Sequence, residues 1–140
     1  MKTSPITSLL LFVSTLFCAA EPKEYSKGVV ATPILITGTT ANGAPIHYPK
    51  TDSPEVKVLM VDIPPGAETG WHKHPLPAVA YVLSGSVTVE LKDGTNYTVH
   101  AGEAFAEVVN TLHNGHNNGS EPVRILMTVI GQKGVPVTEK

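Results

Sequence analysis

The sequence predicts an all-β fold, a single antiparallel sandwich or barrel, and three observations lead to this prediction. Glycine and proline recur at intervals of about eight to twelve residues along most of the chain. Short runs rich in valine and isoleucine lie between them, a pattern typical of sandwiches and barrels. No stretch of useful length repeats its apolar residues with the period of a helix. A chain of 140 residues is long enough for one such domain with a single core.

Residues 1–20 are expected to be a secretory signal peptide. Lys2 gives the start a positive charge, and residues 6–17 are apolar but too few to span a bilayer. Residues 18–20 are small, which suits cleavage after Ala20. An uncleaved N-terminal anchor is the alternative. With cleavage, the mature protein would be periplasmic or secreted and not attached to a membrane.

The composition excludes several classes of function. Cys18 is the only cysteine, so the mature protein would have no disulfide, no catalytic thiolate and no cysteine zinc site. Ten lysines and arginines stand against twelve acidic residues, for a formal net charge of −2, and they form no basic cluster. Nucleic acid is therefore not an expected partner.

The chain divides into an N-terminal part, a barrel and a tail. Residues 21–54 are expected to hold one strand and a long loop, because residues 39–54 are rich in glycine, proline, asparagine and threonine. Residues 55–131 are expected to form the barrel, and residues 132–140 a C-terminal tail. The candidate strands, in chain order, are VVATPILIT, EVKVLMVDI, AVAYVLSG, SVTVELKDG, TNYTVHAG, EAFAEVV and PVRILMTVIG.

Two hairpins are expected in the middle of the barrel. The sequence LSGS would turn the chain between residues 78–83 and 87–91. The sequence KDGT would turn it again between residues 87–91 and 97–99, because Asp-Gly is a strong signal for a two-residue hairpin turn.

The run VKVLMVDI, residues 56–63, is apolar on both of its alternating faces. One barrel buries one face of such a strand, so the second apolar face indicates a further partner. A homodimer is therefore expected.

Two histidines lie two residues apart in the sequence GWHKHP. In a strand, His72 and His74 would point to the same face and could share one metal ion. Iron, zinc, manganese and nickel all accept imidazole nitrogen as a ligand. A pair of histidines on a strand is also found by accident on protein surfaces, so the wider context has to decide.

That context resembles the two signature motifs of the cupin superfamily. In the first, glycine precedes a His-x-His pair by six residues, and a second glycine follows after a liganding glutamate. In the second, a glycine is followed by Pro-x-Gly, a histidine and a closing asparagine. The matching residues here are Gly66, His72, His74 and Gly85, then Gly102, His113 and Asn117. The resemblance covers about residues 58–130 and is greatest to the small single-domain cupins.

The resemblance implies a jelly-roll β-barrel of six to eight antiparallel strands, with one divalent metal inside. Carried over position by position, His72, His74 and His113 would be the metal ligands, and Asn117 would be a structural loop residue. The ion could be iron, zinc, manganese or nickel, because ligand type alone does not separate them.

Three positions depart from the cupin pattern. Ala78 stands where the liganding glutamate belongs, and Val108 and Asn110 replace the proline and glycine before His113. Three neutral imidazoles leave the charge of a divalent ion uncompensated, so such a site should favour an anionic small-molecule ligand or substrate.

Glu107 is a candidate for the missing carboxylate. In the run EAFAEVV it shares a strand face with Phe105, so both would point into the barrel if Phe105 does. Inside the pocket, Glu107 would be a catalytic acid/base or a ligand. If Phe105 instead covers an outer face, Glu107 is solvated.

The other histidines carry no such pattern. His47 and His100 lie beside turn signals and are expected at the surface, and His116 lies in the turn NGHNNG and is expected to be exposed. Trp71 is expected to be a rim or packing residue.

Three functions stay open at this point. The first is a metal-dependent enzyme acting on a small molecule, with dioxygenase, isomerase or lyase chemistry. The second is a binding module that holds a metal or small ligand without turnover. The third is a metal-free structural barrel. No residue identifies the substrate, because one barrel can host many reactions.

Overall fold

The computed structural model describes residues 27–140, so the expected signal peptide lies outside the described residues. Residues Pro33–Lys140 form one compact unit, and this unit carries all the strands. Within the described residues there is no helix, and hence none long and apolar enough to cross a membrane.

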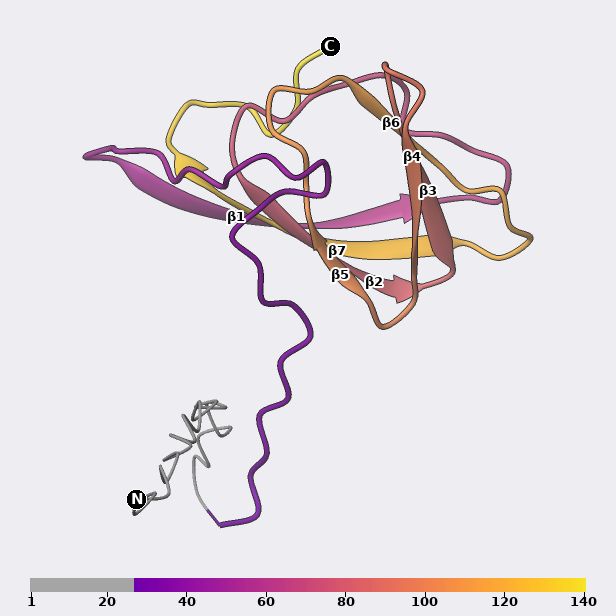
Figure 1. Cartoon of the computed structure of the whole chain (residues 1–140), viewed down its shortest axis with the longest axis horizontal. Helices are drawn as coiled ribbons and strands as arrows, with labels where there is room; N and C mark the ends of the chain where they lie inside the picture. The colour runs from indigo at the N-terminus through magenta and orange to yellow at the C-terminus, as the bar shows by residue number, and fades with distance from the viewer. Residues whose placement is uncertain (1–26) are drawn as a thin grey trace, which may run out of the picture. The chain divides into compact units, whose positions relative to one another are not determined.

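Seven strands form two antiparallel sheets (Figure 1), which confirms the all-β prediction. The first sheet has the order β1-β7-β2-β5 and the second the order β4-β3-β6. The strands are β1 (Pro54–Ile63), β2 (Ala78–Ser84), β3 (Ser86–Leu91), β4 (Asn96–His100), β5 (Ala104–Ala106), β6 (His113–His116) and β7 (Val123–Gln132).

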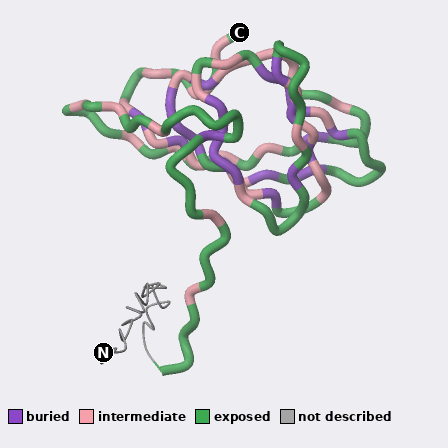
Figure 2. Tube along the Cα trace, in the orientation of Figure 1, coloured by how far each residue is buried: buried purple, intermediate pink, exposed green. Residues whose placement is uncertain are grey.

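The longest pair joins the start of the barrel to its end. β1 and β7 run antiparallel from Pro54 opposite Gln132 to Ile63 opposite Val123. Every second residue of β7 is buried, as the alternation of a strand with one face in the core requires. The residues between them are mostly half-buried, and Figure 2 shows buried, half-buried and exposed stretches following one another along the chain.

The main core lies between the two sheets. It is built from β-branched and aliphatic side chains of both sheets together with one phenylalanine. Its buried members are Ile63, Ala80, Val82, Val87, Val89, Leu91, Val99, Phe105, Val108, Val123 and Ile125. A second, smaller buried cluster consists of Leu76, Ala78, Met127 and Val129.

One expected hairpin is confirmed and the other is wrong. β3 and β4 pair around the Asp93-Gly94 turn, with Ser86 opposite His100. β2 and β3, in contrast, belong to different sheets and do not pair. Gly85 between them has a φ of 72°, and a Cβ there would lie 3.0 Å from the Pro122 carbonyl oxygen. The glycine thus turns the chain from one sheet to the other, close against the segment that leads into β7.

The expected N-terminal strand is also absent from the described residues. The run at residues 29–37 has no strand pairing. Pro33 interrupts the run and has no N–H to donate to a ladder. Ile34 and Ile36 are exposed.

Candidate metal centre

Residues 72–74, here called the histidine segment, are extended but do not belong to one continuous strand. Each of its three residues instead forms a bridge to a different part of the chain. His72 pairs with His113, Lys73 with Glu139 and His74 with Val109. Three separate backbone contacts therefore fix the direction of the two imidazoles.

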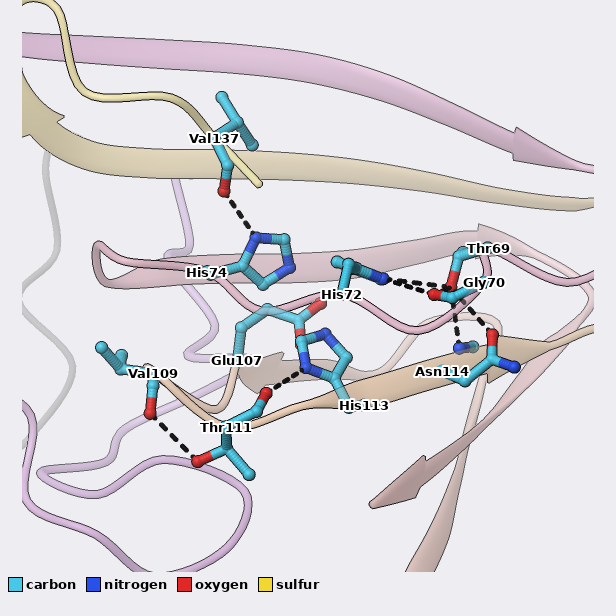
Figure 3. A network of polar contacts seen from close by, with 11 residues as sticks. Thr69, Gly70, His72, His74, Glu107, Val109, Thr111, His113, Asn114 and Val137 are labelled. Carbon is cyan, nitrogen blue, oxygen red and sulfur yellow. Dashed lines mark hydrogen bonds and ion pairs between the residues drawn. The ribbon is translucent and has the colours of Figure 1, made fainter. Parts of the chain in front are cut away.

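The three histidines expected as ligands come together (Figure 3). The ring centroids of His72 and His113 are 4.4 Å apart, and those of His74 lie 5.0 Å from His72 and 5.1 Å from His113. One potential ligand nitrogen from each lies within 4.8 Å of the other two. His74 and His113 are each only 3% exposed. The three side chains are thus positioned so that they could bind one metal ion.

Backbone carbonyls set the tautomer of all three rings. The Nδ1 atoms of His72, His74 and His113 lie 2.7, 2.8 and 2.8 Å from the carbonyl oxygens of Gly70, Val137 and Thr111. A carbonyl can only accept, so each Nδ1 carries the hydrogen and donates it. Each Nε2 then keeps a lone pair. This arrangement of outer hydrogen bonds is the one found around histidines that ligate metals.

Burial keeps two of the imidazoles neutral at neutral pH. Burial lowers the pKa of His113 to about 4, against the opposing effect of its bond to Thr111, and the nearby His72 and His74 lower it further. Burial also lowers the pKa of His74. A neutral imidazole is the form that can ligate a metal.

Glu107 faces the same space. The residue is 8% exposed, and its Oε2 lies 3.9 Å from the Nε2 of His113. Figure 3 shows the carboxyl group pointing toward the imidazoles. Of the two alternatives for this residue, the structure has the inward one. Burial raises the pKa of Glu107 to about 7.

The carboxyl oxygen Oε2 of Glu107 is buried without a hydrogen-bond partner, a condition it shares with the hydroxyl of Tyr97 among the described side chains. A buried carboxylate with no partner costs several kcal/mol. A metal ion, a proton or a bound ligand would each remove this cost. The donor set therefore fits a divalent cation: three imidazoles, each with its Nε2 lone pair free, and a carboxyl oxygen without a hydrogen-bond partner.

Glu107 approaches the site from beside the position of the missing glutamate. Its backbone N–H donates to the carbonyl of Ala78 at 2.9 Å. Ala78 is itself 2% exposed and packs in the smaller core cluster. The chain thus has no carboxylate at residue 78, but it has one on the segment paired with that residue.

The departure at Asn110 has a backbone explanation. Asn110 has a φ of 50°, the one described non-glycine residue with positive φ. Asparagine is among the few residues that tolerate this conformation, so it can stand where the cupin pattern has glycine. Its N–H donates to the carbonyl of His74 at 2.8 Å, so the loop before His113 is bonded to the segment that carries His72 and His74.

The remaining residues singled out in the sequence lie outside the metal centre. His47 and His100 are exposed, as expected. His116 is half-buried, because its two ring nitrogens lie 3.3 and 3.1 Å from carboxylate oxygens of Glu68 and Glu90. The expectation of an exposed His116 is therefore wrong.

Two further residues have structural roles. Asn117 is 1% exposed, and its Nδ2 donates to the carbonyls of Ile63 and Glu121 at 2.9 Å, which supports its expected role in the loop. Trp71 is half-buried beneath the amine of Lys92, which lies 3.5 Å from its ring centroid.

A cavity of about 300 Å³ opens beside the histidines. Most of its wall is apolar: Leu59, Val61, Ile63, Val87, Val89, Phe105, Ile125, Met127 and Val137. Its polar side chains are the three histidines, Thr69, Glu107, Thr138 and Lys140. The three histidines and Glu107 thus lie together in a mostly apolar chamber.

Sequence reasoning missed the part played by the C-terminal residues. Val137 supplies the carbonyl that holds His74, and Thr138 and Lys140 line the cavity. Any residue has a carbonyl group, so no side-chain pattern could have indicated Val137. The alternation of apolar residues in GVPV is the only weak signal of packing there.

The family model for the cupin domain matches residues 59–129, half of the chain. The chain belongs to the cupin family. The match begins in β1 of this cupin and ends in β7, so it contains all three histidines and Glu107. No curated protein matches the chain.

The chain is similar to solved structures, and two of them, with TM-scores of 0.50 and 0.52, share its fold. A protein with a double-stranded β-helix domain from Klebsiella pneumoniae aligns with a TM-score of 0.50 and 22% identity, over 68% of this chain and 91% of that chain. The polyketide cyclase RemF from Streptomyces resistomycificus aligns with a TM-score of 0.52 and 23% identity, over 61% and 59%. A cupin domain from Bordetella pertussis is 27% identical, with a TM-score of 0.48, over 54% and 80%.

Proposed function

We propose that this cupin is a metal-dependent enzyme that acts on a small molecule in the periplasm or outside the cell. His72, His74 and His113 hold one divalent transition-metal ion, and Glu107 is the acid/base. One observation carries the proposal: a buried, unpaired carboxylate oxygen lies 3.9 Å from the Nε2 of a candidate ligand histidine. A barrel with only a structural role would gain nothing from this costly arrangement.

A bound ion supplies Lewis-acid chemistry, or oxygen chemistry if it is iron. The protein residues supply the rest. The carbonyls of Gly70, Val137 and Thr111 orient the imidazoles, and the apolar wall excludes water from the reacting groups. Oε2 of Glu107 accepts a proton from the substrate and returns it, because no other group of the protein occupies that oxygen.

The cavity favours one class of ligand. Its volume of about 300 Å³ is at the lower end for small-molecule sites, and most of its wall is apolar. Imidazole ligands bring no negative charge to a divalent ion, so the bound ion would favour a negatively charged ligand atom, and Lys140 lines the same cavity. We therefore propose a small, largely apolar substrate with one carboxylate or enolate group.

The first test is elemental analysis of the protein purified from its native compartment, with about one divalent ion per chain expected. Protein that stays metal-free when iron, zinc, manganese and nickel are all supplied would overturn the proposal and leave a structural barrel. The identity of the ion also narrows the reaction: iron favours oxygen-dependent cleavage, and a redox-inactive ion favours isomerase or lyase chemistry.

The second test is Glu107→Gln, which keeps the shape of the side chain and removes the charge. Turnover is screened by mass spectrometry with small aryl carboxylates and 1,3-diketones as probes. Retained metal with lost turnover makes Glu107 an acid/base, whereas lost metal makes it a ligand. Unchanged metal and turnover would exclude both roles. Glu103→Gln is the matched control, because Glu103 is exposed and precedes β5, whereas Glu107 is buried and follows it.

If metal-loaded wild type binds the probes and turns none of them over, the site is a binding module. The same Glu107→Gln variant then reports on ligand affinity alone.

A further inference from the structure

Residues 135–139, here called the C-terminal strap, return from β7 and lie along the histidine segment. Lys73 and Glu139 exchange two backbone hydrogen bonds, each of 2.9 Å, and their side chains form an ion pair of 3.2 Å. The amine of Lys57 donates to the carbonyl of Val135 at 2.7 Å. Val135 and Val137 pack against the smaller core cluster. The strap is thus docked by specific contacts along its whole length.

The strap gives His74 a dependence that the other two histidines do not have. His72 and His113 each donate to a carbonyl two residues earlier in their own segment. His74 donates to Val137, which is 63 residues away in sequence. Local backbone geometry therefore holds two of the rings, and the third keeps its orientation only while the strap is docked.

We propose that the strap is a positioning element, which holds His74 in the tautomer and direction that metal binding requires. Docking of the strap and binding of metal are then coupled, each favouring the other. Val137 and Thr138 also line the cavity, so the same segment closes the chamber. This inference rests on the proposed metal site.

The strap can undock without unfolding the barrel. Its residues alternate between exposed and half-buried, and none is fully buried. Two backbone hydrogen bonds hold Lys73 to Glu139, and they stabilise far less than the packed core, so this pair opens more easily than the core.

A matched pair of variants at Glu139 tests the coupling. Glu139→Ala removes the half-exposed ion pair and keeps the backbone N–H that donates to Lys73. Glu139→Pro removes the ion pair and that N–H as well. Zinc affinity is measured by competition with a chromophoric chelator. We expect Glu139→Pro to weaken zinc binding by about 10- to 100-fold, which is the usual effect of losing a hydrogen bond that orients a metal-ligating histidine. Glu139→Ala should change the zinc affinity little. Equal affinities in the two variants would overturn the proposal.

A second measurement needs no metal. In metal-free protein, at a pH well above the ordinary histidine pKa, ¹⁵N NMR reports which ring nitrogen of His74 carries the hydrogen. Wild type and Glu139→Ala should show the hydrogen on Nδ1 alone, and Glu139→Pro a mixture of both tautomers. Wild type that already shows a mixture would sink the proposal, even if zinc binds. Wild type with pure Nδ1–H that binds no metal would instead count against the metal site and leave the positioning role intact.

Hydrogen exchange on the wild-type protein covers the case in which Glu139→Pro fails to fold. Coupling between docking and zinc binding is reciprocal. If docking of the strap raises the affinity for zinc by a certain factor, bound zinc should slow hydrogen exchange at the Glu139 amide by the same factor. The amide of Ala101, which donates to Gly85 in a distant turn, is the internal reference. Equal slowing at both amides would mean that the strap is not coupled to the site.

Discussion

His72 and His113 exchange two backbone hydrogen bonds, of 3.0 and 2.9 Å, and their imidazole centroids lie 4.4 Å apart. His72 belongs to the first cupin motif and His113 to the second. The backbone pairing that joins the two motifs therefore also brings these two candidate ligands together. Metal binding should therefore be sensitive to changes that leave the sheets intact, and it should stabilise the fold in return.

We expect His113→Ala to lose most of its metal, because two imidazoles are too few to hold the ion. The affinity should fall by more than the 10- to 100-fold expected for outer-sphere changes. Metal-loaded wild type should also melt higher than the variant. At a metal concentration about 100 times the Kd, binding to the folded state adds about 2.7 kcal/mol to its stability. Titration calorimetry and thermal melts with and without chelator measure both effects.

The controls for this prediction are His47→Ala and His100→Ala. Both side chains are exposed and lie outside the histidine cluster. Neither variant should change metal content or the metal-dependent gain in melting temperature. A similar loss in all three variants would point to nonspecific histidine binding and against the site.

Glu107 should make the metal-free protein less stable as the pH rises. Burial raises its folded pKa to about 7 from an ordinary 4.5, so the folded state holds the proton more tightly than the unfolded state. The resulting stabilisation is complete below pH 4.5 and is lost as the pH rises through 7. Glu107→Gln should therefore be more stable than wild type above pH 7, by on the order of 3 kcal/mol.

Urea denaturation in excess chelator, repeated across this pH range, measures the difference between the two proteins. The difference isolates Glu107, because His113 has a lowered pKa in both and destabilises both as the pH falls. If the extra stability of Glu107→Gln over wild type does not change with pH, then Glu107 is not protonated in the folded protein. Adding metal should reduce the gain at high pH, since a cation favours the charged carboxylate.

The candidate ligands were predictable because their side chains are specific and their spacing is fixed. His72, His74 and His113 take the positions that the cupin pattern assigns to ligands, and the structure brings them together. The direction of Glu107 was left open by the sequence, because alternation on a short strand decides only which residues share a face. The structure settles the direction, because Phe105 and Glu107 both line the cavity.

The failures share a physical cause, which is dependence on partners distant in sequence. Gly85 turns the chain in a way that suits either a hairpin or a crossing between sheets, and pairing of β2 with β7 decides between them. Val137 acts through its backbone carbonyl, which carries no sequence signature. Asn110 departs from the pattern in residue type, but it adopts a positive φ, which is a conformation that glycine favours.

Export is a separate prediction. The charge at Lys2, the apolar run at residues 6–17 and the small residues before Glu21 predict cleavage after Ala20. N-terminal sequencing of protein from the periplasm or medium should begin at Glu21. Lengthening the apolar run to a full bilayer span should keep the protein in the membrane fraction. Intact protein beginning at Met1 in the cytoplasm would contradict export.

A homodimer is predicted from the outer face of the first sheet. Val56, Val58 and Met60 of β1 are 64%, 62% and 48% exposed, on the face of β1 opposite the core. The register places Ile130, Thr128 and Leu126 of β7 beside them. A largely apolar sheet face of this kind is typical of a surface that another protein covers, and a second copy offers the same face about a twofold axis.

Val58→Lys places a charge at the centre of this face and should convert the dimer to a monomer, measured by light scattering at tens of micromolar. The monomer should stay folded, because Val58 is exposed in the single chain and contributes little to its core. Leu112→Lys is the control, since Leu112 is also partly exposed but precedes β6 in the other sheet. It should leave the dimer intact. Wild type that is already monomeric at this concentration would refute the prediction, and a dimer that survives Val58→Lys would place the interface on another face.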